Sequence, residues 1–160
     1  MTAHESLEEL LAQEDELQFL RFDNDTALAL GQALVAAARE DGLAVTVDVR
    51  RGEQQLFHAA LDGTAADNDA WIERKNRVVR RFGHSSHYVG RLLDGSTIEE
   101  KFLLDGTLFA AHGGAFPVMV RDVGMVGTVT VSGLPSAEDH RLVVAVLRGF
   151  LGLQGASEPG

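Results

Sequence analysis

The block from His112 to His140 restricts the possible fold of this chain more than any other segment. Gly113 and Gly114 allow backbone conformations that are closed to other residues. Pro117 lacks an amide donor and is therefore expected at a strand start or edge. The run 117–120, the turn 121–124 and the run 125–132 predict a β-hairpin. Ser136 then opens a capping-box-like helix start. The block therefore predicts a sheet followed by a helix that packs on it.

The remaining apolar patterns predict further helices and strands. We expect an opening helix that includes Leu7, Leu10, Leu11, Leu17 and Phe19, helices over 27–41 and 67–82, a short helix that starts at Ser85 or Ser86, and strands over 43–50, 53–61 and 108–111. Residues 98–104 are ambiguous between helix and strand. A frayed tail is expected after Leu153, with 154–160 disordered. These elements predict one α+β domain over residues 1–160, an antiparallel sheet flanked by helices.

Composition excludes several classes of function. The chain has 160 residues, a formal net charge of −10 and no cysteine. The acidic balance argues against nucleic acid as a partner, because phosphate binding needs an excess of basic residues. Without cysteine there is no disulfide framework and no thiolate metal site. The start carries no signal-like segment and no apolar run is long enough to span a bilayer, so we expect a cytoplasmic protein without a membrane partner.

The predicted helix over 67–82 carries an unusual concentration of positive charge. Arg74 and Arg77 fall on its polar side, whereas Lys75 falls within the apolar stripe. The arginines fit a solvated basic face, a subunit contact or an anion site. Lys75 either snorkels to the surface or needs a carboxylate or carbonyl partner to offset its desolvation. We therefore take Arg74, Lys75 and Arg77 as candidate ligand-binding residues.

Histidines and their neighbours supply the other candidates. His84 and His87 lie three residues apart, with Ser85 and Ser86 between them, and the serines also suit a cap or turn. We predict no metal site there, because two histidines at this spacing form a weak motif. His112 precedes Gly113 and Gly114, a pair that fits either a ligand-binding loop or a β-bulge. His140 lies in the first turn of the last helix, where a buried structural hydrogen bond and an axial haem ligand are both compatible with the pattern.

Three segments together resemble a known family. They are Trp71-Ile72-Glu73-Arg74-Lys75 with the Ser85-Ser86 element after it, His112-Gly113-Gly114-Ala115-Phe116-Pro117, and the run from Gly124 to His140. Over residues 5 to 152 the chain resembles the UPF0303 family of the haem-degrading-domain superfamily, which includes GlcG-like and HbpS-like proteins. The resemblance implies a profilin-like, GlcG-like fold around a five-stranded antiparallel sheet. Haem is the cofactor that it suggests.

The sequence leaves three functions open. The first is binding of a small anionic ligand, haem or a related tetrapyrrole, by a homo-oligomer. The second is an oligomeric interaction or accessory protein without a cofactor, since relatives resemble assemblies and one fungal member resembles an accessory factor in protein targeting. The third is an enzyme acting on a small carboxylate, suggested by the GlcG-like relatives. No catalytic residue can be named, because nucleophile-elbow, P-loop and dinucleotide-binding motifs are all absent from the sequence.

Overall fold

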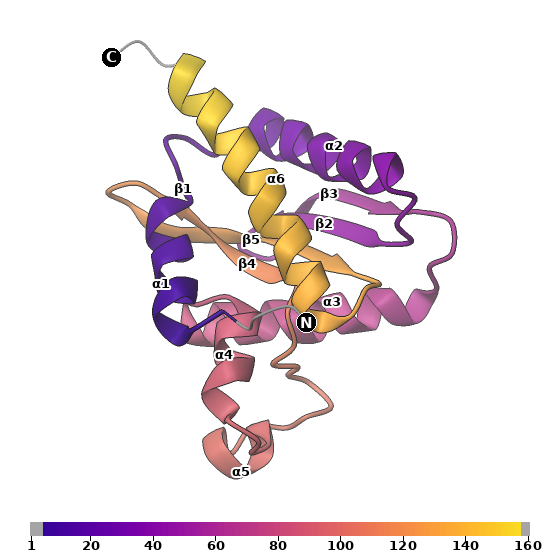
Figure 1. Cartoon of the computed structure of the whole chain (residues 1–160), viewed down its shortest axis with the longest axis vertical. Coiled ribbons are helices and arrows are strands. Elements are labelled where there is room, and N and C mark those ends of the chain that lie inside the picture. The colour runs from indigo at the N-terminus through magenta and orange to yellow at the C-terminus, as the bar shows by residue number, and fades with distance from the viewer. Residues whose placement is uncertain (1–4, 158–160) are drawn as a thin grey trace.

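The computed structural model describes residues 5–157 as helices packed on a five-stranded sheet (Figure 1). The helices are α1 (Leu7–Glu16), α2 (Asn24–Glu40), α3 (Ala66–Phe82), α4 (Ser86–Leu93), α5 (Ile98–Phe102) and α6 (Ser136–Ser157). The strands are β1 (Gln18–Phe19), β2 (Thr46–Arg51), β3 (Gln54–Ala60), β4 (Ala115–Val120) and β5 (Gly124–Ser132).

The sheet confirms the predicted α+β class. Its strand order is β1-β4-β5-β2-β3, and the predicted hairpins β2–β3 and β4–β5 are both present. Pairing is antiparallel throughout, except that the edge strand β1 runs parallel to β4. The five-stranded sheet therefore combines an antiparallel centre with one parallel edge.

Two predicted elements are wrong. Phe19 belongs to β1 rather than to the opening helix, because α1 ends at Glu16 and Phe19 pairs with Val120 of β4. Residues 108–111 are not a strand but part of the loop that follows α5, and Ala110 donates its amide to Arg74 O at 3.2 Å. The ambiguous segment 98–104 resolves as the short helix α5, which Thr97 caps.

The last helix continues beyond the predicted frayed end. α6 extends to Ser157, so residues 154–157 of the expected tail are helical, whereas 158–160 lie outside the described residues. Gln154 is buried, accepts from the Leu20 amide at 2.8 Å and donates to Arg21 O at 3.1 Å. These bonds tie the end of the helix to the segment after β1.

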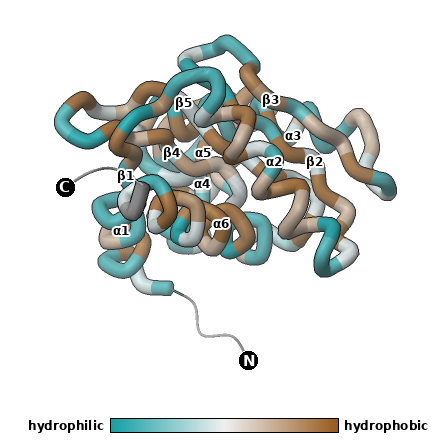
Figure 2. The backbone as a smooth tube through the Cα atoms, turned by 90° about the horizontal axis from the view of Figure 1, so that it is seen from above, coloured by the Kyte–Doolittle hydropathy of each residue, from teal (hydrophilic) through white to brown (hydrophobic). Residues whose placement is uncertain are grey.

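The two faces of the sheet differ in chemistry. Val47, Val49, Val129 and Val131 point to the side covered by α2 and α6, where they form the main hydrophobic core with residues such as Leu34. The alternating positions point to α3 and are polar: Thr46, Asp48, Arg50, Thr128, Thr130 and Ser132. Figure 2 shows hydrophobic segments in the interior strands and hydrophilic segments in the outer turns.

Helices α4 and α5 form an arm that extends away from the sheet (Figure 1). A second, smaller hydrophobic cluster holds the arm to α3. It consists of Val78, Val89 and Ile98, with Phe82, Tyr88, Phe102, Leu104, Phe109 and Ala111 packed against them. The arm returns through residues 103–114 to β4, and this return segment carries His112.

Candidate functional site

Lys75 is buried against the end of β5 and the start of α6. Its Nζ donates to Val131 O at 3.0 Å and to Asp139 Oδ2 at 3.2 Å, and both side chains are less than 5% exposed. Burial lowers the pKa of Lys75 and raises the pKa of Asp139, although each partner's charge opposes the shift of the other. The expectation of a carboxylate or carbonyl partner is confirmed, and the snorkelling alternative is wrong.

The loop that carries His112 fits tightly over this pair. Gly114 has φ +132°, and a Cβ there would lie 2.3 Å from Val131 O and 2.7 Å from Lys75 Nζ. Gly113 donates its amide to Ser136 Oγ at 2.5 Å. The predicted Gly-Gly segment therefore brings main chain close to the Lys75–Asp139 pair, which any side chain at Gly114 would prevent.

His112 is exposed and packs edge-to-face on Trp71, with 5.2 Å between the ring centroids. The Arg74 guanidinium lies 4.1 Å from the centroid of the same Trp71 ring. Partial burial, followed by the charges of Lys75 and Arg74, lowers the pKa of His112 below its ordinary value. At neutral pH the imidazole is therefore neutral and able to accept a hydrogen bond or bind a metal ion.

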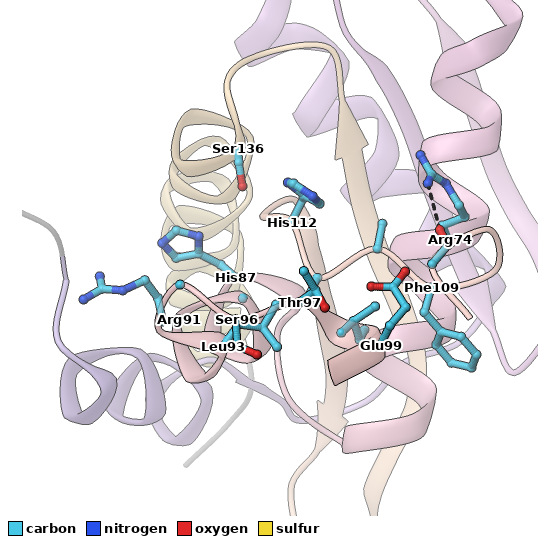
Figure 3. Close-up of a pocket in the computed structure, with 16 residues that line it drawn as sticks. Arg74, His87, Arg91, Leu93, Ser96, Thr97, Glu99, Phe109, His112 and Ser136 are labelled. Carbon is cyan, nitrogen blue, oxygen red and sulfur yellow. Dashed lines mark hydrogen bonds between the residues drawn. The ribbon is translucent and has the colours of Figure 1, made fainter. Parts of the chain in front are cut away.

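Two cavities adjoin His112, and its side chain lines both. The larger cavity, about 510 Å³, lies between the arm and the body and is lined by Arg74, His87, Arg91, Glu99, Phe109, His112 and Ser136 among others. The smaller, about 300 Å³, is lined by Asn68, Trp71, Lys75, His112, Ser132, Gly133, Leu134, Ser136 and Asp139. Figure 3 shows Arg74 and Arg91 on opposite sides of the larger cavity. His112 and Ser136 form the wall common to the two spaces.

The arginines of α3 hold the return segment of the arm. Arg74 donates to Gly106 O at 3.2 Å, and Arg77 donates to Leu108 O at 3.1 Å. Arg74 lines the larger cavity, whereas Arg77 lines neither. The basic face is thus partly structural, and only Arg74 of these two also reaches the candidate site.

His84, Ser85 and Ser86 lie outside both cavities. His84 Nδ1 lies 2.8 Å from Glu14 Oε1 of α1, and Ser85 caps α4 by accepting from the Tyr88 amide. Ser86 Oγ accepts from the Ala115 amide at 3.0 Å and donates to Ala115 O at 3.3 Å. Ser85 thus has the cap role expected for this segment, whereas the contacts of His84 and Ser86 join α4 and the segment before it to α1 and β4.

His140 is buried between α6, α4 and α1. Its Nε2 lies 2.8 Å from Gln13 Oε1, so Nε2 carries the donated proton, and the ring stacks on His87 with centroids 4.7 Å apart. Burial, followed by the charge of His87, lowers the pKa of His140 to about 3. With a neutral, 1% exposed ring, His140 matches the structural hydrogen bond rather than an open axial-ligand position.

A polar cluster under α3 was missed from the sequence. Asp48 is fully buried and accepts from Arg50 Nε at 2.9 Å, Gln55 Nε2 at 2.8 Å and Asn76 Nδ2 at 3.3 Å. Arg50 also pairs with Glu73 at 2.5 Å. The alternation of valine with Thr46, Asp48 and Arg50 was the available signal, because polar residues at every second position of a central strand must share one face.

Across residues 5–157 we find no group of three or more His, Asp or Glu side chains that could hold a metal ion. In the same part of the chain, no helix combines the length and the hydropathy that crossing a membrane requires.

Comparison with known proteins places this chain in a family. UPF0303 protein SCO2848 of Streptomyces coelicolor is 58% identical over 146 residues, which cover 90% of this chain and 92% of that protein. The chain belongs to the UPF0303 family. Residues 22–148 also match the family described as "Haem degrading protein HbpS-like". The sequence resemblance is thereby confirmed.

Solved structures confirm the fold of this UPF0303 protein. The crystal structure of Ybr137w protein matches with a TM-score of 0.88 and 35% identity, covering 92% of this chain and 90% of that chain. The PduOC:Heme complex matches with a TM-score of 0.66 and 14% identity, covering 79% of this chain and 93% of that one. The second likeness concerns the fold alone.

Proposed function

We propose that this UPF0303 protein binds a small carboxylate-bearing ligand in the larger cavity, with haem or a related tetrapyrrole as the first candidate. The observation that carries the proposal is the position of His112, an exposed and neutral imidazole on the wall of a 510 Å³ cavity that Arg74 and Arg91 also line. Ligand pockets of this size combine apolar walls with a few placed polar groups.

The residues present fit such a ligand. A guanidinium has five donors suited to carboxylates, of which Arg74 uses one on Gly106 O and Arg91 uses one on Glu5 O. Phe109, Ile98 and Ala110 supply apolar wall. His112 would supply the nitrogen for haem iron, and Arg74 or Arg91 would hold the propionates. Two likenesses support haem in particular: the HbpS-like family match and the haem complex of PduOC, a protein of the same fold.

A haemin titration followed by visible absorbance tests the proposal. We expect a saturable shift of the Soret band that His112→Ala abolishes and His84→Ala leaves unchanged, because His84 lies outside both cavities. Metal-free protoporphyrin IX separates the contact between His112 and the iron from the contact between arginine and the propionates. It should bind to His112→Ala as well as to the original chain, and more weakly to Arg74→Gln. A Soret shift that is absent, or equal in His112→Ala, would contradict the proposal.

The homo-oligomeric state and the cytoplasmic location stay predictions. Light scattering on the size-exclusion peak measures the mass directly. A mass of 17.2 kDa would contradict assembly.

A further inference from the structure

Lys75 presents an amine to the wall of the smaller cavity. An ammonium has three donors. Two are taken by Val131 O and Asp139 Oδ2, and the third has no acceptor among the described residues. The cavity that Lys75 lines also holds polar groups from Asn68, Ser132 and Ser136.

The choice of lysine at this position is informative. The chain has 14 basic residues, and the sequence shows that two of them are lysines, Lys75 and Lys101. Arginine is the usual residue for a buried ion pair, because its fork matches a carboxylate and it keeps its proton. A lysine can lose its proton when buried and then act as a nucleophile. Lys75 is therefore an amine that can lose its proton, at a position where a permanent charge would favour arginine.

We propose that Lys75 forms an imine with a small polar aldehyde in the smaller cavity, with Asp139 as its proton partner. The inference is independent of the function proposed for the larger cavity, because it concerns a different space and a different group. The volume of about 300 Å³ selects a small molecule. Asn68, Ser132 and Ser136 offer hydrogen bonds to its hydroxyl groups, so a hydroxyaldehyde fits better than an apolar one.

The step balances with the groups present. Lys75 transfers a proton from Nζ to Asp139 Oδ2, 3.2 Å away, which leaves an amine and a carboxylic acid. The amine adds to the carbonyl carbon, and a proton moves from nitrogen to oxygen to give a carbinolamine. Asp139 returns its proton to the hydroxyl group, which departs as water. The products are a protonated imine and the Asp139 carboxylate, with no oxidant or reductant consumed.

The electrostatics of the pair agree with this exchange. Burial lowers the pKa of Lys75 and raises that of Asp139, so the two groups approach each other in proton affinity. Gly114 lets its main chain pack beside Nζ, where a Cβ would lie 2.7 Å from that atom.

Reductive trapping tests the inference in the full chain. The folded protein is incubated at neutral pH with glyceraldehyde and sodium cyanoborohydride, and peptide mass mapping gives the labelled fraction at Lys75 and Lys101. Lys101 is exposed and serves as an internal reference. We expect Lys75 to be labelled at least tenfold faster than Lys101. In urea the two rates should become similar, because the selectivity comes from the folded site.

Lys75→Arg is the matched variant, since it keeps a cation and removes the amine. Labelling of Lys101 should be unchanged in it. Equal or slower labelling of Lys75 in the folded original chain would overturn the inference. Neither result depends on haemin binding, so the two proposals fail separately.

Discussion

The two sides of the sheet differ in the side chains that they bury. The side under α2 and α6 is built from valines and other fully buried apolar residues, and its burial stabilises the fold. The side under α3 buries charges and hydroxyl groups, which gain little stability even when they are paired. Both cavities adjoin α3 through Arg74 or Lys75. The apolar face therefore stabilises the fold, and both proposed binding sites lie on the polar face.

The largest effect is expected on the apolar side. Phe116 is fully buried in the main core, and Phe116→Ala should lower the free energy of unfolding by about 4 kcal/mol through lost burial and a residual cavity. Urea unfolding measures the change. A loss below about 1 kcal/mol would break the assignment of stability to this side.

On the polar side, a single substitution should also be costly, for a different reason. Lys75→Met leaves the Asp139 carboxylate buried without its cation, a cost of about 3 kcal/mol at neutral pH. The pKa of Asp139 is already raised, so protonation at lower pH removes the unpaired charge. The difference in stability between this variant and the original chain should therefore shrink as pH falls. A pH-independent difference would show that lost packing, not charge, is responsible.

His140 should make the fold sensitive to acid. Its folded pKa of about 3 lies below its ordinary value of about 6.5, so protonation favours the unfolded state. Its contribution is complete above pH 6.5 and falls by about 1.4 kcal/mol per pH unit between 6.5 and 3. Stability measured against pH should fall less steeply in His140→Gln than in the original chain. An equal slope in His140→Gln and in the original chain would contradict the assignment.

The smallest effects compare neighbouring residues on opposite faces. Thr128 is fully buried and its hydroxyl has no hydrogen-bond partner among the described residues, so Thr128→Val should stabilise the fold by about 1 kcal/mol. Val129→Thr places a hydroxyl group in the main core and should cost about 2 kcal/mol. Thermal unfolding shows whether the melting temperature of each variant is higher or lower than that of the original chain. A shift in the same direction for both variants would contradict the distinction between the two faces.

Local patterns predicted most of the fold. The helix over 67–82, the hairpins and the helix after Pro135 follow from periodicity, turns and caps, which act within a few residues. β1 was missed because two residues carry no strand period, and its pairing with β4 is set by tertiary packing. The run 108–111 looked strand-like, but its apolar residues Phe109 and Ala111 pack on the arm cluster instead.

The candidate site was predictable only in part. The position of Lys75 in an apolar stripe indicated a buried partner, yet Asp139 lies 64 residues away and no local pattern identifies it. His84 and His140 carried similar signals to His112, and only the fold separates them: the first pairs with Glu14, the second is buried on Gln13, and His112 reaches the cavities.

The most direct test of this division is the stability of the double variant Lys75→Met/Asp139→Asn, measured by urea unfolding. The asparagine side chain keeps an acceptor for the Leu134 amide, which Asp139 Oδ1 accepts in the original chain, while the buried charges are both removed. If the pair serves function, the free energy of unfolding should stay within about 1 kcal/mol of the original value, as replaced buried ion pairs often do. A loss of about 3 kcal/mol or more, the size expected for a broken buried pair, would mean that the polar side holds the fold together, and would contradict the account.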